Sequence, residues 1–162
     1  DGAVVGEPTG LRVCAAQRGM LLLKCTARGQ SGHVANAQML GAVDAIHKAA
    51  RDIVKVAAMD FPAHPLLGSQ KAQVTQISGG LQRNQVPDAC EFFIDLRTGP
   101  DQDHEALCAD FQRQLESEVA IHSQRYLPKG TDPKHAIVRA ALQAAKKAGP
   151  VGSGTTSDWA FL

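Results

Sequence analysis

The sequence predicts an α+β protein whose main unit is a ferredoxin-like sandwich, a four-stranded antiparallel sheet with two helices on one face. Three observations lead to this fold class. Apolar residues alternate along residues 89–97, as they do in a strand with one buried face. They recur every three or four positions along residues 36–57, as in a helix. The elements expected between residues 20 and 127 follow one another in the order β-α-β-β-α-β.

Two strands are expected at the start of the chain, over residues 12–17 and 20–28. The second contains the apolar run Met20-Leu21-Leu22-Leu23-Lys24-Cys25, and Gly29 ends it. It is the first strand of the predicted sandwich.

The longest expected helix covers residues 36–57. Its apolar positions have the spacing of a helix with one buried face. They are Leu40, Val43, Ile46, Ala50, Ile53, Val54 and Ala57. The segment Phe61-Pro62-Ala63-His64-Pro65 cannot continue the helix, because proline lacks the amide donor and disfavours helical geometry in the residue before it.

Two further strands are expected over residues 73–77 and 89–97, with Gly79-Gly80 and Pro87-Asp88 between them. The later strand alternates along its whole length. One face is apolar and is formed by Cys90, Phe92, Ile94 and Leu96.

The last expected elements are a helix, a strand and a third helix. Gly99-Pro100-Asp101 opens the first of these helices, which carries an apolar stripe, and residues 119–127 follow as the fourth strand. The stripe consists of Leu107, Phe111 and Leu115. The third helix begins at Asp132-Pro133, because proline suits the first helical position, and stops at Gly149-Pro150. It lies outside the sandwich.

Length and charge exclude several classes of protein. The chain has 162 residues and a mass of 17.1 kDa, enough for one domain with a core. Its 17 basic and 16 acidic residues give a net charge of +1, so we expect no nucleic-acid partner and no anionic membrane partner. No apolar run approaches the roughly 20 residues that cross a bilayer, and residues 1–6 do not resemble a signal peptide.

The cysteines favour a reducing compartment. There are four of them, far apart and without a Cys-x-x-Cys pair, at Cys14, Cys25, Cys90 and Cys108. Reduced thiols are typical of the cytoplasm, so we expect a soluble cytoplasmic protein.

No motif in the chain is sufficient for metal or nucleotide binding by itself. The six histidines form no His-Glu-x-x-His helix and no Cys/His zinc pattern, so we expect no tight metal binding by this chain alone. The segment Gly152-Ser153-Gly154-Thr155-Thr156 lacks the Gly-Lys-Ser/Thr end of a phosphate loop.

Four short segments nevertheless form a recognisable set around the predicted sandwich. They are Val5-Gly6-Glu7-Pro8-Thr9, Gly29-Gln30-Ser31-Gly32-His33, Gly79-Gly80-Leu81-Gln82-Arg83-Asn84-Gln85-Val86-Pro87 and Thr156-Ser157-Asp158. In this order they resemble the zinc aminoacylase and carboxypeptidase family, which includes acetylornithine deacetylase, succinyl-diaminopimelate desuccinylase and carboxypeptidase G2.

The resemblance implies that Glu7 is a ligand of a zinc site holding two ions in the complete enzyme, where cobalt could replace zinc. A carboxylate suits such a cation, although a glutamate at a turn is commonly just solvated. It also implies that His33 enters the active site of the other subunit of a homodimer and hydrogen-bonds the developing oxyanion. The alternative for His33 is a loop histidine without a role.

Three further residues match substrate-binding positions of the family, each with a plainer alternative. Asn84 corresponds to an asparagine that reaches substrate across the dimer, or is a turn-forming asparagine. Arg97 corresponds to an arginine that binds the substrate carboxylate, or pairs with Asp95 two residues away. Thr156 belongs to a substrate-holding loop, or to a plain linker.

The resemblance also indicates what the 162 residues do not contain. Members of the family have a His-x-Asp segment and a Glu-Glu pair upstream, and a further histidine ligand downstream; none occurs here. We therefore expect a lid and dimerisation domain at residues 19–128, with flanks of an α/β catalytic domain at residues 1–18 and 129–162.

The implied function is part of a zinc-dependent amide hydrolase that removes the acyl group from N-acyl amino acids. An acetylornithine-like substrate is the first choice, with succinyl-diaminopimelate or a dipeptide as alternatives. A non-catalytic ferredoxin-like module that dimerises or binds a small molecule is the rival hypothesis.

Overall fold

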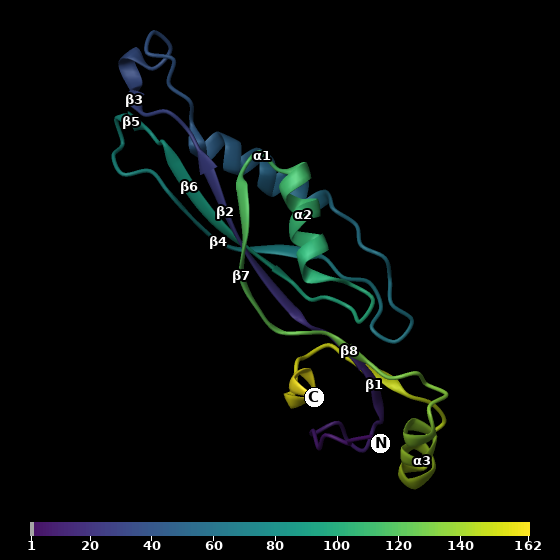
Figure 1. Ribbon diagram of the computed structural model, residues 1–162. Helices are drawn as coiled ribbons and strands as arrows, with labels where there is room; N and C mark the ends of the chain where they lie inside the picture. The colour runs from purple at the N-terminus through teal and green to yellow at the C-terminus, as the bar shows by residue number, and fades with distance from the viewer. Residues whose placement is uncertain (1) are drawn as a thin grey trace.

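The computed structural model describes residues 2–162, which form an elongated molecule of two lobes (Figure 1). The main lobe spans residues 20–126 and the small lobe contains residues 2–19 and 127–162. The main lobe is built from β2 (Met20–Arg28), β3 (Gly32–His33), η1 (Val34–Asn36), α1 (Ala45–Ala58), β4 (Ala72–Gly79), β5 (Gln85–Val86), β6 (Ala89–Leu96), α2 (His104–Gln114) and β7 (Glu118–Tyr126). The small lobe is built from β1 (Cys14–Gln17), β8 (Lys129–Gly130), α3 (Ala136–Ala145), β9 (Val151–Ser153) and η2 (Asp158–Phe161).

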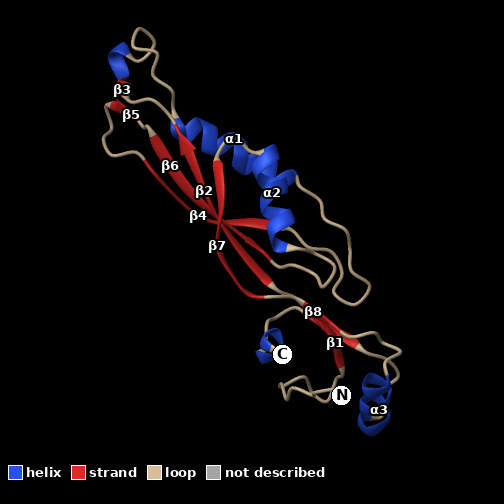
Figure 2. Ribbon diagram, in the orientation of Figure 1, coloured by secondary structure: helices blue, strands red, loops and turns tan. Residues whose placement is uncertain are grey.

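The sheet of the main lobe confirms the predicted fold class. Its strands are ordered β4-β6-β2-β7 and every neighbouring pair is antiparallel. Figure 2 shows α1 and α2 lying on the same face of this sheet. With the small pair β3–β5 set aside, the chain order is β-α-β-β-α-β, as predicted.

The core lies between the sheet and the two helices. On β6 the alternation is confirmed, because Cys90, Phe92, Ile94 and Leu96 are each at most 1% exposed. Leu21, Leu23, Cys25 and Ala27 on β2 and Phe111 on α2 belong to the same cluster. Burial of these aromatic and aliphatic side chains, at about 25 cal/mol per Å² of apolar surface, is the main source of stability.

The prediction that the first helix starts near residue 36 is wrong. Helix α1 begins at Ala45, because the Asp44 carboxylate caps it by accepting hydrogen bonds from the amides of Ile46 and His47 at 2.8 and 3.1 Å. Upstream, Gly41 has a φ of +63° and the amide of Val43 donates to the carbonyl of Gln30. The backbone there pairs with another segment instead of continuing a helix.

The predicted buried face of this helix is also wrong. The residues of α1 that are buried are Ala45, Ala49, Asp52 and Val56. Ile46 is 37% exposed and Val54 is 70% exposed, so part of the predicted apolar stripe points away from the sheet. Ala45 and Ala49 let the start of the helix lie close to the sheet, Ile53 and Val56 pack against the core, and Ile46 and Val54 remain outside.

Asp52 anchors this orientation of α1. Its carboxylate accepts hydrogen bonds from the amides of Glu116 and Ser117 at 3.0 and 2.8 Å and from the Ser117 hydroxyl at 2.7 Å. Lys55 Nζ lies 3.3 Å away. Burial would raise the pKa of Asp52, but these hydrogen bonds outweigh it and the pKa is lowered. Asp52 therefore ties α1 to the turn before β7.

The other two helices are shorter than predicted. Helix α2 begins at His104 rather than at residues 99–101, because the Asp103 side chain caps it through the amide of Ala106 at 2.8 Å. Helix α3 covers Ala136–Ala145 and ends at Lys146, which has a φ of +52°. As predicted, α3 lies outside the sandwich (Figure 1).

The small lobe contains a three-stranded sheet in the order β8-β1-β9. Strand β1 is antiparallel to β8 and parallel to β9, so the predicted strand near residues 12–17 belongs to this sheet, apart from the sandwich.

The four cysteines are free thiols. Among the described residues, no helix combines the length and apolarity that a membrane span requires.

Candidate functional site

The tip of the main lobe brings His33 and Asn84 together. Strands β3 and β5 pair there with His33 opposite Gln85, and the carbonyl of Asn84 accepts a hydrogen bond from the amide of Val34 at 2.9 Å. Gln85 Nε2 also donates to the Ser31 hydroxyl at 2.6 Å. Two segments about fifty residues apart in the sequence are thus joined into one structural unit.

His33 is exposed, and its hydrogen bond identifies its donor atom. Nδ1 accepts from the amide of Ala35 at 3.2 Å, because His33 is the N-cap of η1. In the neutral imidazole, an accepting Nδ1 leaves the proton on Nε2. The tip therefore presents an N–H donor on an exposed side chain, next to the segment whose backbone pairs with the Asn84 carbonyl.

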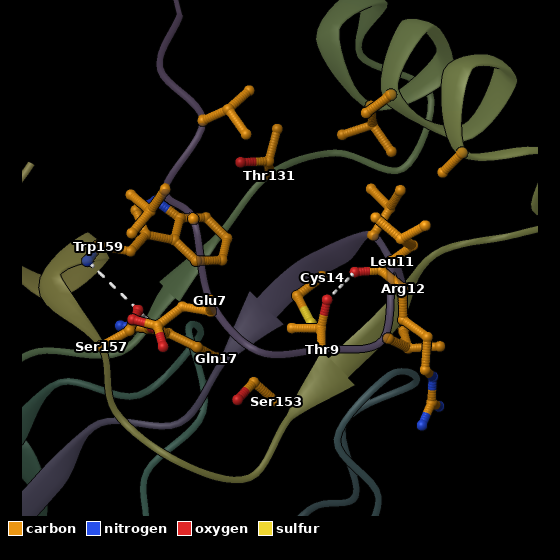
Figure 3. A pocket seen from close by; sticks show the side chains of 18 of the residues that line it. Glu7, Thr9, Leu11, Arg12, Cys14, Gln17, Thr131, Ser153, Ser157 and Trp159 are labelled. Atoms are coloured by element: carbon orange, nitrogen blue, oxygen red, sulfur yellow. Dashed lines mark hydrogen bonds between the residues drawn. The ribbon is translucent and has the colours of Figure 1, made fainter.

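Glu7 lies in the small lobe, on the wall of a pocket of about 920 Å³. The pocket is enclosed by the N-terminal segment, β1, β9, α3 and the segment leading into η2. Figure 3 shows Glu7, Gln17, Ser157 and Trp159 gathered on one side of it. Thr155 and Ser157 line the pocket on either side of Thr156 in the sequence. Glu7 and the loop that contains Thr156 are therefore parts of one site.

Arg97 immediately follows β6, at the end of the main lobe that faces the small lobe. Its Nε and Nη2 donate to the two carboxylate oxygens of Asp95 at 2.9 and 3.1 Å. The ion pair that the sequence offered as an alternative is thus present. It leaves Nη1 of a half-exposed guanidinium free of any hydrogen bond with residues 2–162.

The candidate residues fall into two groups at opposite ends of the molecule. In Figure 1 the β3–β5 tip lies at one end, whereas the two termini and the pocket lobe lie at the other. The structure joins His33 to Asn84, and Glu7 to the Thr156 loop. Within one chain it does not bring the first group to the second.

The described residues do not make a metal site by themselves. Within residues 2–162, no three His, Cys, Asp or Glu side chains cluster closely enough to hold an ion. Glu7 could supply one carboxylate, whereas zinc sites in proteins have three or four protein ligands. The chain alone does not fit a closed zinc site.

Sequence reasoning missed two residues at the junction of the lobes, Gln17 and Arg18. Both are buried, with 1% and 7% exposure, and their polar atoms face neighbouring segments. Arg18 had one available signal, a basic residue between a strand and Gly19 in an otherwise apolar stretch. Gln17 had none.

Comparison with known protein families gives one match. The peptidase dimerisation domain of the M20 family matches residues 15–123, which include the whole main lobe except the end of β7. A comparison with curated protein sequences gave no match.

Solved structures share the fold at low sequence identity. Aminopeptidase PepT from Bacillus cereus is 20% identical, with 90% of this chain aligned to 40% of that chain at a TM-score of 0.65. An amidase of the hydantoinase/carbamoylase family from Burkholderia multivorans is 25% identical, with coverage of 91% and 38% and a TM-score of 0.60. The M20 metallo-carboxypeptidase Sso-CP2 from Sulfolobus solfataricus is 14% identical, with coverage of 94% and 56% and a TM-score of 0.64. The chain thus spans between about two fifths and three fifths of the length of these structures.

Proposed function

The chain belongs to the M20 peptidase dimerisation domain family, and from this premise we propose that it is the lid and dimerisation part of a metal-dependent amide hydrolase. Residues 19–128 are the lid. Residues 1–18 and 129–162 are flanks that belong with the catalytic domain. The substrates are N-acyl amino acids, with an acetylornithine-like N-acetyl amino acid as the first choice because of the segments around Glu7 and His33.

The observation that carries the proposal is the separation of the two groups of site residues. The tip with His33 and Asn84 lies at the opposite end of the molecule from Glu7 and Thr156 (Figure 1). A site that uses both groups needs a second copy of the chain, whose tip would reach this copy's small lobe. A homodimer related by a two-fold axis would form two such sites.

A dimer surface of suitable chemistry lies on the main lobe. Ile46, Ala50 and Val54 form the outer face of α1, and Ile77 of the neighbouring edge strand β4 is 53% exposed. Ile77 is paired with Phe92, a helix-side residue, so it lies on the same side of the sheet as α1. We call these four residues the α1–β4 face. Exposed apolar residues next to an unpaired strand edge favour pairing with a second copy.

His33 would stabilise the oxyanion that forms at the scissile carbonyl. Its Nδ1 is occupied by the amide of Ala35, so Nε2–H is available as a donor in the neutral form. A pre-positioned donor of this kind contributes about 10²–10³-fold to turnover in amide hydrolysis.

Arg97, Asn84 and Thr156 would bind the α-carboxylate of the substrate. Asp95 fixes the Arg97 guanidinium through two hydrogen bonds and leaves Nη1 for a ligand oxygen. Asn84 would approach from the partner's tip, and Thr156 from the loop whose residues Thr155 and Ser157 line the same chain's pocket.

Glu7 would hold one of two zinc ions together with ligands outside this chain. When bound, such ions lower the pKa of a water molecule so that it can attack the amide. Within the chain, the contribution of Glu7 is a carboxylate on the pocket wall, two residues before the Thr9–Arg12 turn that fixes the segment.

Subunit complementation in the complete enzyme tests this proposal. His33→Ala and Glu7→Ala should each abolish most of the hydrolysis of N-acetyl amino acids. In a mixed dimer, the site with intact Glu7 receives an intact His33 from the partner. Random exchange makes half of the dimers mixed, so roughly a quarter of all sites should recover.

The rival, a dimerisation module without a catalytic role, predicts a different result. It predicts that neither substitution changes the hydrolysis rate. If both variants are inactive, subunits exchange and no activity returns, then His33 does not act across the dimer.

A further inference from the structure

Arg18 joins three segments at the junction of the lobes. Its Nη2 donates to the carbonyls of Leu67 and Ser69 at 2.7 and 2.8 Å, with the carbonyl of Gly68 at 3.4 Å. Its Nη1 donates to Gln70 Oε1 at 3.0 Å and to the carbonyl of Arg97 at 2.9 Å. The loop between α1 and β4 and the end of β6 are therefore held by one guanidinium.

All these acceptors are neutral, and Arg18 forms no ion pair with any residue of 2–162. Burial lowers the pKa of Arg18. A buried charge is tolerated only where its donors are satisfied, and the planar guanidinium requires its acceptors at fixed positions. Arg18 therefore sets the geometry of the backbone around it.

Arg18 and its neighbour Gln17 also hold the loop that contains Thr156. The amide of Arg18 donates to the carbonyl of Ser153 at 3.1 Å, three residues before Thr156. The hydroxyl of Ser157, the residue after Thr156, donates to Gln17 Oε1 at 2.5 Å. Ser157 Oγ also accepts from the amide of Trp159 at 3.3 Å and so caps η2. Thr156 is thus fixed from both sides by the end of β1.

The α1–β4 loop packs so closely against β9 that no side chain larger than that of glycine fits between them at Gly152. A side-chain carbon at Gly152 would lie 2.3 Å from the carbonyl oxygen of Leu66 and 2.6 Å from Leu67 Cδ2. Next to Arg18, the amide of Gly19 donates to the carbonyl of Thr98 at 2.9 Å. The segment 17–19 therefore contacts both the strand end at Arg97–Thr98 and the loop 153–157.

We infer that Gln17 and Arg18 are positioning residues that hold Arg97 and Thr156 at a fixed separation across the junction. Arg18 fixes the backbone of Arg97, and Gln17 and Arg18 together fix the segment 153–157. The inference rests on the proposed function, in which Arg97 and Thr156 bind one substrate carboxylate from two lobes.

Trp159 reports on this arrangement in the chain itself, because it is the only tryptophan and follows the segment that Gln17 holds. Gln17→Leu removes the acceptor for Ser157, and Arg18→Lys keeps the charge but removes the planar fork. Arg139→Lys, at an exposed position of α3, is the matched control. Acrylamide quenching of Trp159 should rise about two-fold or more in both junction variants, and not in the control, while far-UV circular dichroism shows a folded main lobe.

In the complete enzyme, the same variants should raise KM for an N-acetyl amino acid by about 10-fold or more, with a smaller change in kcat. Arg18→Lys should retain more activity than Arg18→Met. A stabilising role alone would lower the urea midpoint and leave Trp159 quenching and KM unchanged in the folded protein. That result would overturn the inference.

Two controls keep the outcomes separate. If Arg18→Lys does not fold, Gln17→Leu carries the test, because it removes a single contact. If the wild-type enzyme does not hydrolyse N-acyl amino acids, the proposed function fails, whereas unchanged Trp159 quenching in Gln17→Leu overturns the positioning role whatever the substrate.

Discussion

The two helices of the main lobe cover the same face of one sheet, but their outer surfaces differ. The outer face of α1 carries Ile46, Ala50 and Val54, and Val54 is 70% exposed. The outer face of α2 is mostly polar or small, with Glu105, Ala106, Ala109, Gln112 and Arg113 exposed. Both helices direct apolar residues at the core, but α1 also has large apolar residues on its outer face.

The difference indicates which side of the sandwich is adapted to a protein partner. Each helix lies nearest one edge of the sheet, α1 beside β4 and α2 beside β7. The apolar outer surface of α1 continues to the edge at Ile77, whereas the α2 side has charged and polar groups. Contact with water is unfavourable for the apolar α1 surface and favourable for the polar α2 surface.

The largest expected effect is the loss of dimerisation when the α1–β4 face is charged. The double substitution Val54→Asp/Ile77→Asp would bury two unpaired carboxylates per subunit in the interface. We expect the dimer dissociation constant to rise at least about 1000-fold, equivalent to about 4 kcal/mol. Sedimentation velocity measures this directly.

The matched control lies on the α2 side. Ala109→Asp places a carboxylate on the exposed face of α2 and should leave the dimer intact. Equal dissociation by Ala109→Asp, or a dimer that persists in the double variant, would remove the distinction between the two helices.

A smaller effect is expected from the residue that fixes which face of α1 points outward. Asp52 is fully buried and receives hydrogen bonds from Glu116 and Ser117. Asp52→Ala leaves these donors without a partner, so we expect the free energy of unfolding to fall by about 3 kcal/mol in urea denaturation. Asp60→Ala removes an exposed carboxylate that pairs with Lys71 and should leave the free energy of unfolding nearly unchanged.

The smallest effect concerns the buried polar residue of α2. His104 is 3% exposed, its Nε2 lies 2.8 Å from Thr98 Oγ1, and burial lowers its pKa below the usual 6.5. The unfolded chain takes up a proton near pH 6.5, and the folded chain takes it up only at lower pH. The contribution to stability is therefore fully present above about pH 6.5 and is lost as the pH falls below it.

Thermal or urea unfolding across that pH range measures the effect. His104→Gln should flatten the pH dependence, whereas His47→Gln, at an exposed position of α1, should leave it as it is. A dependence that survives in His104→Gln would show that another group is responsible.

Strand periodicity was predicted well because it depends on one physical fact, the burial of a single face. Burial alternates at every residue of β6 and the structure buries the predicted side, although Phe93 makes the other face partly apolar as well. The helix at residues 36–57 was harder. Its apolar stripe is real, but periodicity only shows that a face is apolar and does not identify what covers that face. The buried side of α1 is formed by two alanines, an aspartate and Val56, and a hydrophobic pattern does not select the aspartate or distinguish these alanines from exposed ones.

For the candidate site, too, the sequence predicts some features and not others. Glu7, His33, Asn84, Arg97 and Thr156 came from short segments that resemble a family, and their roles remain proposals. The separation of His33 and Asn84 from Glu7 and the Thr156 loop, at opposite ends of the molecule, could not be predicted, because it depends on how far the sheet separates β3 from β9. Arg18 acts mainly through backbone carbonyls and Gln17 through the hydroxyl of Ser157, and the sequence does not show which segments supply these partners.

The mass of the chain in solution tests the central claim, that the α1–β4 face joins two copies. We predict that sedimentation equilibrium at micromolar concentration gives a mass of about 34 kDa, twice the 17.1 kDa of one chain. A mass of 17.1 kDa that persists at the highest attainable concentration would contradict the claim, because two copies would then have no stable surface through which to share a site.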